Sequence, residues 1–480
     1  MKLFEHPACY NNKLLLTFFA AVCSALILIN MGKMQTKWLL VFIMLASFPI
    51  FMFIIGSLKK SLLAILIFSF SMKMDFNPWY SNSGFGIPVS LSGITILSLY
   101  ALWFIEIMKK QERPKLFPSV TIPIALLVLW SGFSFMVAAK PSNVLYGFVF
   151  AMEFLLCYFY IANLSDSKSY MPFILNCIAV TVMFSSAIGI IQYFFPGRLN
   201  LQFLGWEDDA LKLRYGSALI IRAVGFLGHA NALAKFLNCW LPVLFVFSFI
   251  SEKSKYKIFY IAAFSLGVLT LILTFSRGGW LSFFFSIILI MAILISKNEI
   301  NIKFARIARM LIAIAVVIII AALPFYHHIH QRLKRDDYDA AANRITLAKT
   351  AFQIIRERPL TGTGLKNYES MTSYTPFVGN TPTVHNVYLH TAAELGIPAA
   401  LIFIYIYIAF FFKGFNALKR GDRTVVLFIL GLIAGLAANF LHGMFELGNI
   451  GDSAFLPVAF MGGLIICLKN SQEGNNLGHI

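Results

Sequence analysis

The sequence predicts an all-α polytopic membrane protein with about 12 to 14 transmembrane helices and one large extracytoplasmic loop that contains an amphipathic helix. Of the 480 residues, 59% are hydrophobic and only 12% are charged, whereas a typical soluble domain carries about 25% charged residues. Apolar runs long enough to cross a bilayer recur from end to end. We therefore expect one integral domain, made of an N-terminal transmembrane bundle (1–326), an extracytoplasmic loop (327–384) and C-terminal transmembrane helices (385–480).

The apolar runs locate the individual spans. They lie at 14–30, 38–56, 60–74, 89–108, 119–138, 144–163, 171–195, 231–250, 257–275, 279–296, 309–326, 385–412, 424–445 and 453–468. The third run is short, and only the tight turn Ser276-Arg277-Gly278-Gly279 separates two others. Fusing or dropping spans at these places gives the lower count of about twelve and leaves the orientation of the large loop unchanged.

Lys and Arg in the short loops predict the orientation of the chain. With a cytoplasmic N-terminus, the inside loops hold most of the basic residues: Lys59, Lys60, Lys109, Lys110, Arg113, Lys115, Lys253, Lys255, Lys257, Lys297, Lys303, Arg306, Arg309, Lys413, Lys419, Arg420 and Arg423. The opposite short loops hold Lys33, Lys37, Lys73 and Lys140. Both termini are thus expected in the cytoplasm, with 196–230 and 327–384 outside. Anionic membrane lipids account for much of the +18 net charge, and no basic nucleic-acid-binding module is visible.

The extracytoplasmic loop has internal order. Asp339 to Arg358 has the spacing of an amphipathic helix, and Pro359 ends it. The Thr361-Gly362-Thr363-Gly364 segment that follows predicts a tight turn. Its backbone N–H groups either face an anion or let the loop pack closely on the bundle, and the sequence leaves both readings open.

A histidine marks the point where this polar loop meets the next apolar run. His385 lies in Val384-His385-Asn386-Val387, and a histidine at a water–membrane boundary is placed to move protons. His390 and His442 are expected to be polar helix ends. The cluster His327, His328 and His330 lacks a companion carboxylate spacing, and the six cysteines show no paired spacing. We therefore expect no metal site and no cofactor.

Four segments together resemble one known family. His385-Asn386, nine residues and then Gly396 resemble the His-(Asn/Ser/Gln)-x9-Gly signature of the O-antigen ligase and polymerase superfamily of bacterial envelope glycan enzymes. Ser276-Arg277-Gly278 resembles its Ser-Arg-Gly turn, and Arg344 with the Pro359–Gly364 segment resembles the start and end of its large periplasmic loop. Arg222-Ala223-Val224-Gly225-Phe226, followed by Asn231 and Ala234, matches a looser pattern of the family. The resemblance covers about residues 220–400.

The resemblance implies a glycosyltransferase of the bacterial inner (cytoplasmic) membrane. Its donor would be a glycan on polyprenyl (undecaprenyl) pyrophosphate, its acceptor a growing glycan or a lipid-linked terminal acceptor, and membrane lipids would surround both. Because pyrophosphate leaves readily once its charge is neutralised, Arg277 and Arg344 are predicted to clamp it. Neutral His385 is predicted to take the proton of the acceptor hydroxyl, which gives an inverting, metal-independent displacement.

The remaining site residues and the rival functions follow from the same segments. Arg222, Asn386, Gly362 and Gly364 are expected to bind pyrophosphate or substrate. Ligases of the family usually carry Gly, Thr or Tyr three residues after the motif glycine, whereas this chain has Ala399, so polymerase and ligase both stay open. A glycolipid flippase or secondary transporter is the main rival from another class, although the sequence shows no paired halves. A peptidoglycan-type polymerase would need an outer carboxylate, for which the sequence offers Asp336, Asp337 and Asp339.

Overall fold

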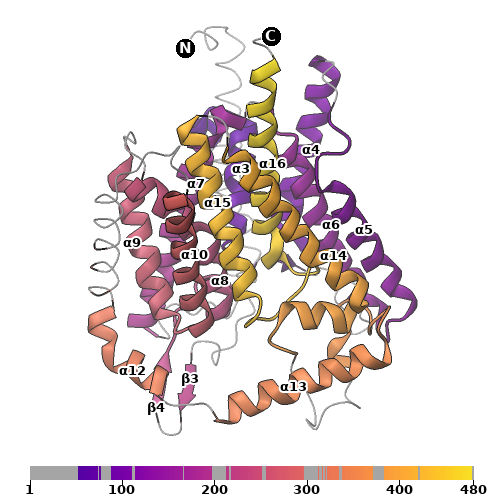
Figure 1. Ribbon diagram of the computed structural model, residues 1–480, viewed down its shortest axis with the longest axis vertical. Helices are drawn as coiled ribbons and strands as arrows, with labels where there is room; N and C mark the ends of the chain where they lie inside the picture. The colour runs from indigo at the N-terminus through magenta and orange to yellow at the C-terminus, as the bar shows by residue number, and fades with distance from the viewer. Residues whose placement is uncertain are drawn as a thin grey trace, which may run out of the picture.

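The computed structural model describes residues 52–73, 75–76, 88–110, 114–165, 167–196, 212–215, 218–250, 256–296, 312, 316, 319, 322–334, 338–370, 383–419 and 422–477. Within them the fold is a bundle of helices with two small hairpins (Figure 1). The helices are α3 (Leu58–Ser69), α4 (Leu91–Lys110), α5 (Thr121–Phe133), α6 (Pro141–Ala162), α7 (Ser167–Phe194), α8 (Ala230–Phe245), α9 (Lys257–Leu273), α10 (Arg277–Ser296), α12 (Tyr326–Lys334), α13 (Tyr338–Glu357), α14 (Val387–Ala417), α15 (Arg423–His442) and α16 (Leu456–Leu477). The antiparallel hairpins are β1 (Asp75–Phe76) with β2 (Val89–Ser90), and β3 (Lys212–Tyr215) with β4 (Ala218–Ile221).

In the described part of the chain, eight helices are long and apolar enough to cross a membrane. They are α4, α6, α7, α8 with its π-helical extension Val246–Ile250, α10, α14, α15 and α16 with the turn before it. The sequence predicts spans at all eight places, so the polytopic helical fold is confirmed. The runs at 60–74, 119–138 and 257–275 also form helices, but α3, α5 and α9 are shorter than these eight. The predicted spans at 14–30, most of 38–56 and most of 309–326 lie outside the described residues.

The centre of the bundle is α8, which is almost entirely buried. It packs against α9, α10 and α15, while α16 packs against α6 and α14. The buried core joins Trp240 of α8 to Phe460 of α16 and Phe70 after α3, whose rings are 6.2 and 6.3 Å from that of Trp240. Burial of this apolar core fixes the relative positions of α8 and its neighbours. The polar residues at one end of these helices are thereby held in place.

Helix α13 and the hairpin β3–β4 lie at the same end of the molecule, opposite the C-terminal end of α16 (Figure 1). Helix α13 lies where the sequence predicts an amphipathic helix: Leu347, Ala351 and Ile354 form its buried face and pack towards Ala393 of α14. The hairpins were not expected from the sequence. Each is only two to four residues per strand, too short for a periodic signal.

Helix α14 is broken inside its first half. The sequence predicts one uninterrupted span over 385–412, but Gly396 has φ 83° and ψ 167°, which is not helical. The carbonyl groups just before the break find donors elsewhere: Ala393 accepts from Thr363 N at 3.0 Å, Glu394 from Gly364 N at 2.8 Å and Leu395 from Trp130 Nε1 at 2.8 Å. A break within an apolar helix is tolerated where other parts of the protein supply the missing hydrogen bonds.

Candidate active site

His385 is held where α14 begins. Asn386 is the N-cap of that helix, and its Oδ1 accepts from Tyr388 N and Leu389 N, both at 3.0 Å. Val387 N donates to Gly443 O at 2.8 Å, which fastens the start of α14 to the connection between α15 and α16. The backbone that directly follows His385 is therefore fixed. The His385 Nδ1 is buried and has no hydrogen-bond partner among the described residues.

Arg222 lies between β4 and α8, and its side chain is fixed by the protein. It is only 8% exposed; its Nε donates to Thr274 O at 2.7 Å and its Nη2 to Asn231 Oδ1 at 3.0 Å. Burial lowers the pKa of Arg222 to about 10, partly opposed by the charge of Glu446, so the guanidinium stays protonated at neutral pH. Thr274 belongs to the turn between α9 and α10. Arg222 is thereby joined to the turn that also carries Arg277.

Arg277 is the first residue of α10. Its half-buried guanidinium makes no hydrogen bond or ion pair with any part of the chain that the structure describes. The next residue, Gly278, packs so closely on Phe445 that an added Cβ would lie 2.9 Å from the Phe445 Cβ. The start of α10 thus adjoins the same connection that holds His385.

Glu446 is a site residue that the sequence reading missed. It is 6% exposed, and its buried Oε2 has no hydrogen-bond partner among the described residues. Burial raises the pKa of this carboxyl, opposed by a backbone hydrogen bond and by the charges of Lys235, His385 and Arg222. A lone glutamate in Phe445-Glu446-Leu447-Gly448 looks like an ordinary loop residue in the sequence. The available signal was a carboxylate in a short apolar connection on the side predicted to be extracytoplasmic.

The charges around His385 set its protonation. Burial lowers its pKa; the negative charge of Glu446 opposes this, and the electrostatic interactions with Arg344 and His229 lower the pKa further. His385 is therefore neutral at neutral pH. Arg344, near the start of α13, is exposed, and its positive charge is one of the causes that lower the pKa of His385.

Gly362 and Gly364 serve the packing of the loop. Gly362 N donates to Arg358 O at 3.0 Å and Gly364 N to Glu394 O at 2.8 Å, so both amides are already bonded within the protein. A Cβ at Gly362 would lie 2.4 Å from the carbonyl carbon of Glu394. Of the two readings that the sequence leaves open, the contacts support close packing on α14. Asn386 similarly uses its side-chain oxygen for the helix cap.

The buried carboxylate of Glu394 holds the end of the extracytoplasmic loop against α14. Glu394 is 1% exposed and accepts from Lys366 N at 2.9 Å, from Tyr368 N at 3.1 Å and from the Asn449 side chain. His390 Nε2 lies 3.4 Å from its Oε1. Glu394 therefore ties the end of the loop to α14 and to the connection between α15 and α16, and His390 is part of this buried network.

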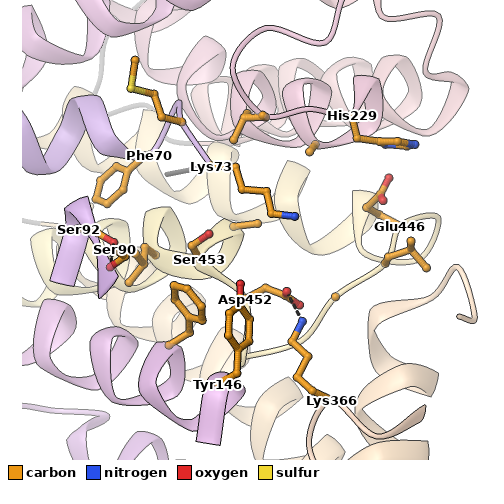
Figure 2. A pocket seen from close by; sticks show the side chains of 18 of the residues that line it. Phe70, Lys73, Ser90, Ser92, Tyr146, His229, Lys366, Glu446, Asp452 and Ser453 are labelled. Atoms are coloured by element: carbon orange, nitrogen blue, oxygen red, sulfur yellow. Dashed lines mark hydrogen bonds and ion pairs between the residues drawn. The ribbon is translucent and has the colours of Figure 1, made fainter. Parts of the chain in front are cut away.

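A cavity of about 600 Å³ opens beside these residues. Figure 2 shows Glu446 and His229 on one side of the cavity and the Lys366–Asp452 ion pair with Tyr146 on the other. Lys73 lies between these two groups. Lys73 and His229 were, like Glu446, not singled out from the sequence. Across the described ranges, no group of three or more His, Cys, Asp or Glu side chains is arranged to hold a metal ion.

Comparison with known proteins identifies the domain that contains most of this site. Residues 262–404 match the sequence model of the family described as O-antigen ligase. The chain therefore carries an O-antigen ligase domain. The family resemblance seen in the sequence is thus confirmed for these residues, and the family is one of glycan-transferring membrane enzymes. The domain includes Arg277, Arg344 and His385, whereas Arg222 and Glu446 flank it.

The comparisons with curated proteins and with solved structures add little to the O-antigen ligase match. No curated protein matches the sequence significantly. A solved structure described as "Structural coordination of polymerization and crosslinking by a peptidoglycan synthase complex" contains a chain that is similar at 16% identity with a TM-score of 0.39, covering 74% of this chain and 97% of that one. Asp336 and Asp337, which a peptidoglycan-type site would need, lie outside the described residues, as does the Asp339 side chain.

Proposed function

We propose that the protein transfers a glycan from a polyprenyl pyrophosphate donor to a hydroxyl of an acceptor glycan, either to extend a polysaccharide or to attach it to a lipid-linked terminal acceptor. The observation that carries this proposal is the meeting of a neutral histidine with buried and unpaired cationic groups at one end of the bundle. The O-antigen ligase domain supports it, because envelope glycans are the substrates of that family.

His385 is the proposed base. Its neutral imidazole accepts the proton of the acceptor hydroxyl as that oxygen attacks the anomeric carbon of the donor. The new bond joins the acceptor oxygen to the anomeric carbon, and the bond between that carbon and the phosphate oxygen breaks. Its electron pair leaves with the polyprenyl pyrophosphate. A single displacement of this kind inverts the anomeric configuration and draws only on side chains of the protein.

Arg222 and Arg277 are the proposed pyrophosphate clamp, with Arg344 contributing from the loop. Arg222 is held by two protein acceptors, which leaves its remaining N–H groups in a fixed direction. Arg277 has no protein partner in the described ranges, so its planar fork is free to bind phosphate oxygens in pairs. Charges set in place before the reaction stabilise the leaving group as its negative charge develops.

Glu446 is the proposed partner of the base. Its negative charge favours the protonated form of His385, which is the form that exists once the proton has been transferred. A carboxylate that stabilises an imidazolium in this way is a recurrent arrangement in catalytic sites. The burial of Glu446 keeps the interaction away from solvent screening.

The decisive experiment uses purified protein in lipid nanodiscs with polyprenyl-pyrophosphate-linked glycan extracted from the source cells, acceptor and a metal chelator. His385→Ala should lower the rate of glycosidic-bond formation by about two to four orders of magnitude if proton transfer limits the rate. Retention of the donor on the variant should be unchanged, because the arginines hold the pyrophosphate.

His330→Ala in α12 is the matched control, since His330 lies outside the cluster of His385, Arg222 and Glu446. Its rate should equal that of the wild type. A wild-type rate from His385→Ala, or loss of all transfer in chelator, would defeat the proposed chemistry. Movement of the lipid-linked donor across the membrane without a new glycosidic bond would identify a flippase instead.

A further inference from the structure

The cavity beside the site has a second end that the proposed chemistry does not use. Its lining runs from Glu446 and His229 to residues of α4 and α6 on the far wall, and Figure 2 shows Ser90, Ser92 and Tyr146 there. Helix α6 belongs to the N-terminal half of the bundle, well before the O-antigen ligase domain at 262–404. The cavity therefore extends from Glu446, the proposed partner of the base, to a surface that the family match does not cover.

This far wall carries polar side chains that the protein holds in place. Ser90 and Ser92 donate to the buried Glu153 at 2.5 and 2.8 Å, which fixes the start of α4 against α6. Asn143 donates through Nδ2 to Lys366 O at 3.1 Å. The Tyr146 ring lines the cavity one turn further along α6. Amide and hydroxyl groups beside an aromatic ring offer the mixed hydrogen bonding and apolar contact that a sugar ring needs.

The charges along the whole cavity argue against a diphosphate inside it. Its lining holds four carboxyl residues, Glu369, Glu394, Glu446 and Asp452, against two lysines, Lys73 and Lys366. Lys366 is paired with Asp452; burial raises the pKa of Asp452, but the charge and hydrogen bond of Lys366 outweigh it and keep the carboxyl ionised. Arg222, Arg277 and Arg344 are not among the lining residues. A dianionic headgroup would meet more negative than positive groups here.

We propose that the cavity is the acceptor subsite, in which Asn143 and Tyr146 bind the terminal sugars of an uncharged or weakly charged acceptor glycan. The attacking hydroxyl then lies at the Glu446 end, next to His385, while the donor pyrophosphate stays on the arginine side. This inference rests on the proposed glycan transfer, because it assigns the acceptor glycan of that reaction to the cavity.

The first test separates acceptor from donor kinetics. Tyr146→Ala should raise the acceptor KM about five- to tenfold, the loss expected from one hydrogen bond and an aromatic contact, while the donor KM changes less than twofold. Tyr146→Phe should give a smaller rise. Phe148→Ala is the control: it is an aromatic of the same helix, but it packs towards Gly132 of α5 and not into the cavity. Its acceptor KM should match the wild type.

The second test measures binding without catalysis. Asn143→Cys protein in proteoliposomes is treated with a methanethiosulfonate reagent, with wild-type protein giving the background of the native cysteines. Oligosaccharide released by mild acid from the lipid-linked glycan of the source cells should slow the labelling at least fivefold. Inorganic pyrophosphate at the same concentration should leave the labelling unchanged.

The outcomes distinguish this inference from the proposed function. Protection by pyrophosphate in place of oligosaccharide, or protection by neither, would overturn the acceptor subsite. An unchanged acceptor KM in Tyr146→Ala, with transfer intact, would overturn the subsite and leave the proposed chemistry standing. Protection by oligosaccharide in a protein that forms no glycosidic bond would support glycan binding at this wall and overturn the proposed chemistry.

Discussion

At the scale of single residues, the environment of His385 makes a prediction about pH. The imidazole acts as a base only when neutral, and burial together with Arg344 and His229 lowers its pKa below the ordinary 6.5. The midpoint of the acid limb should therefore lie below pH 6.5, and transfer should fall as the pH drops through that midpoint. The measurement is the pH profile of kcat/KM, whose acid limb reports the essential base of the free enzyme.

The same profile tests Glu446. Its charge raises the pKa of His385 against the larger effect of burial, so Glu446→Gln should move the acid limb to still lower pH and reduce the plateau rate. Glu357→Gln, at the exposed end of α13, carries the same chemical change away from the site and should leave the profile in place. An acid limb above pH 6.5 in the wild type, or one that Glu446→Gln moves upward, would contradict the proposed arrangement.

A substitution at Arg277 tests the pyrophosphate clamp, because the proposed role of this residue depends on the planar shape of the guanidinium as well as on its charge. Arg277→Lys keeps the positive charge but loses the planar fork that binds two phosphate oxygens at once. We expect transfer to fall about tenfold or more, equivalent to at least about 1.4 kcal/mol of transition-state stabilisation, with normal amounts of membrane-inserted protein. Arg356→Lys on the exposed face of α13 is the control, and equal activity in the two variants would remove the clamp from the mechanism.

At the scale of elements, the broken helix α14 positions the base. The segment from His385 to Gly396 is held by α13, by the loop turn and by Glu394, while the part after Gly396 packs in the bundle. At Gly396 an added Cβ would lie 2.1 Å from Leu360 O, and φ 83° with ψ 167° belongs to a region that only glycine adopts readily. The break therefore depends on this one glycine.

Gly396→Ala should destabilise the fold by about 3 kcal/mol, from backbone strain and from the loop that must move aside. A lower midpoint of thermal unfolding in detergent, followed by tryptophan fluorescence, checks it, since Trp130 donates to Leu395 O next to the break. Gly132→Ala in α5 is the control: Gly132 is helical, and its nearest neighbour is the edge of the Phe148 ring at 3.2 Å. Equal midpoints would show that α14 tolerates a side chain at its break.

At the scale of the whole molecule, hydropathy located the eight helices that are long enough to cross a membrane in the described residues, because span length is a local property of the sequence. The motif around His385 and the arginines near 222, 277 and 344 were found for a similar reason, since each stands out in its own segment. Glu446 was missed because its burial and its charged neighbours Lys235, Arg222 and His385 arise only from tertiary packing of distant segments. The cavity wall at Asn143 and Tyr146 was missed because it joins helices more than two hundred residues from His385 in sequence.

Orientation is the remaining property of the whole molecule that the Lys/Arg bias predicts. Helix α13 and the end of α14 with its following connection lie at opposite ends of the bundle (Figure 1), so one cysteine at each end reports which face is outside. Gln353→Cys, exposed on α13, should react with an impermeant maleimide added to intact spheroplasts. Lys419→Cys, exposed after α14, should react only once the membrane is permeabilised.

Wild-type protein gives the background of the native cysteines, and transfer activity measured in each variant verifies its folding. Labelling in the opposite order would place His385 and the arginines on the cytoplasmic face, where a glycan-exporting cell keeps its nucleotide-sugar chemistry, and would remove the basis for an extracytoplasmic transfer reaction.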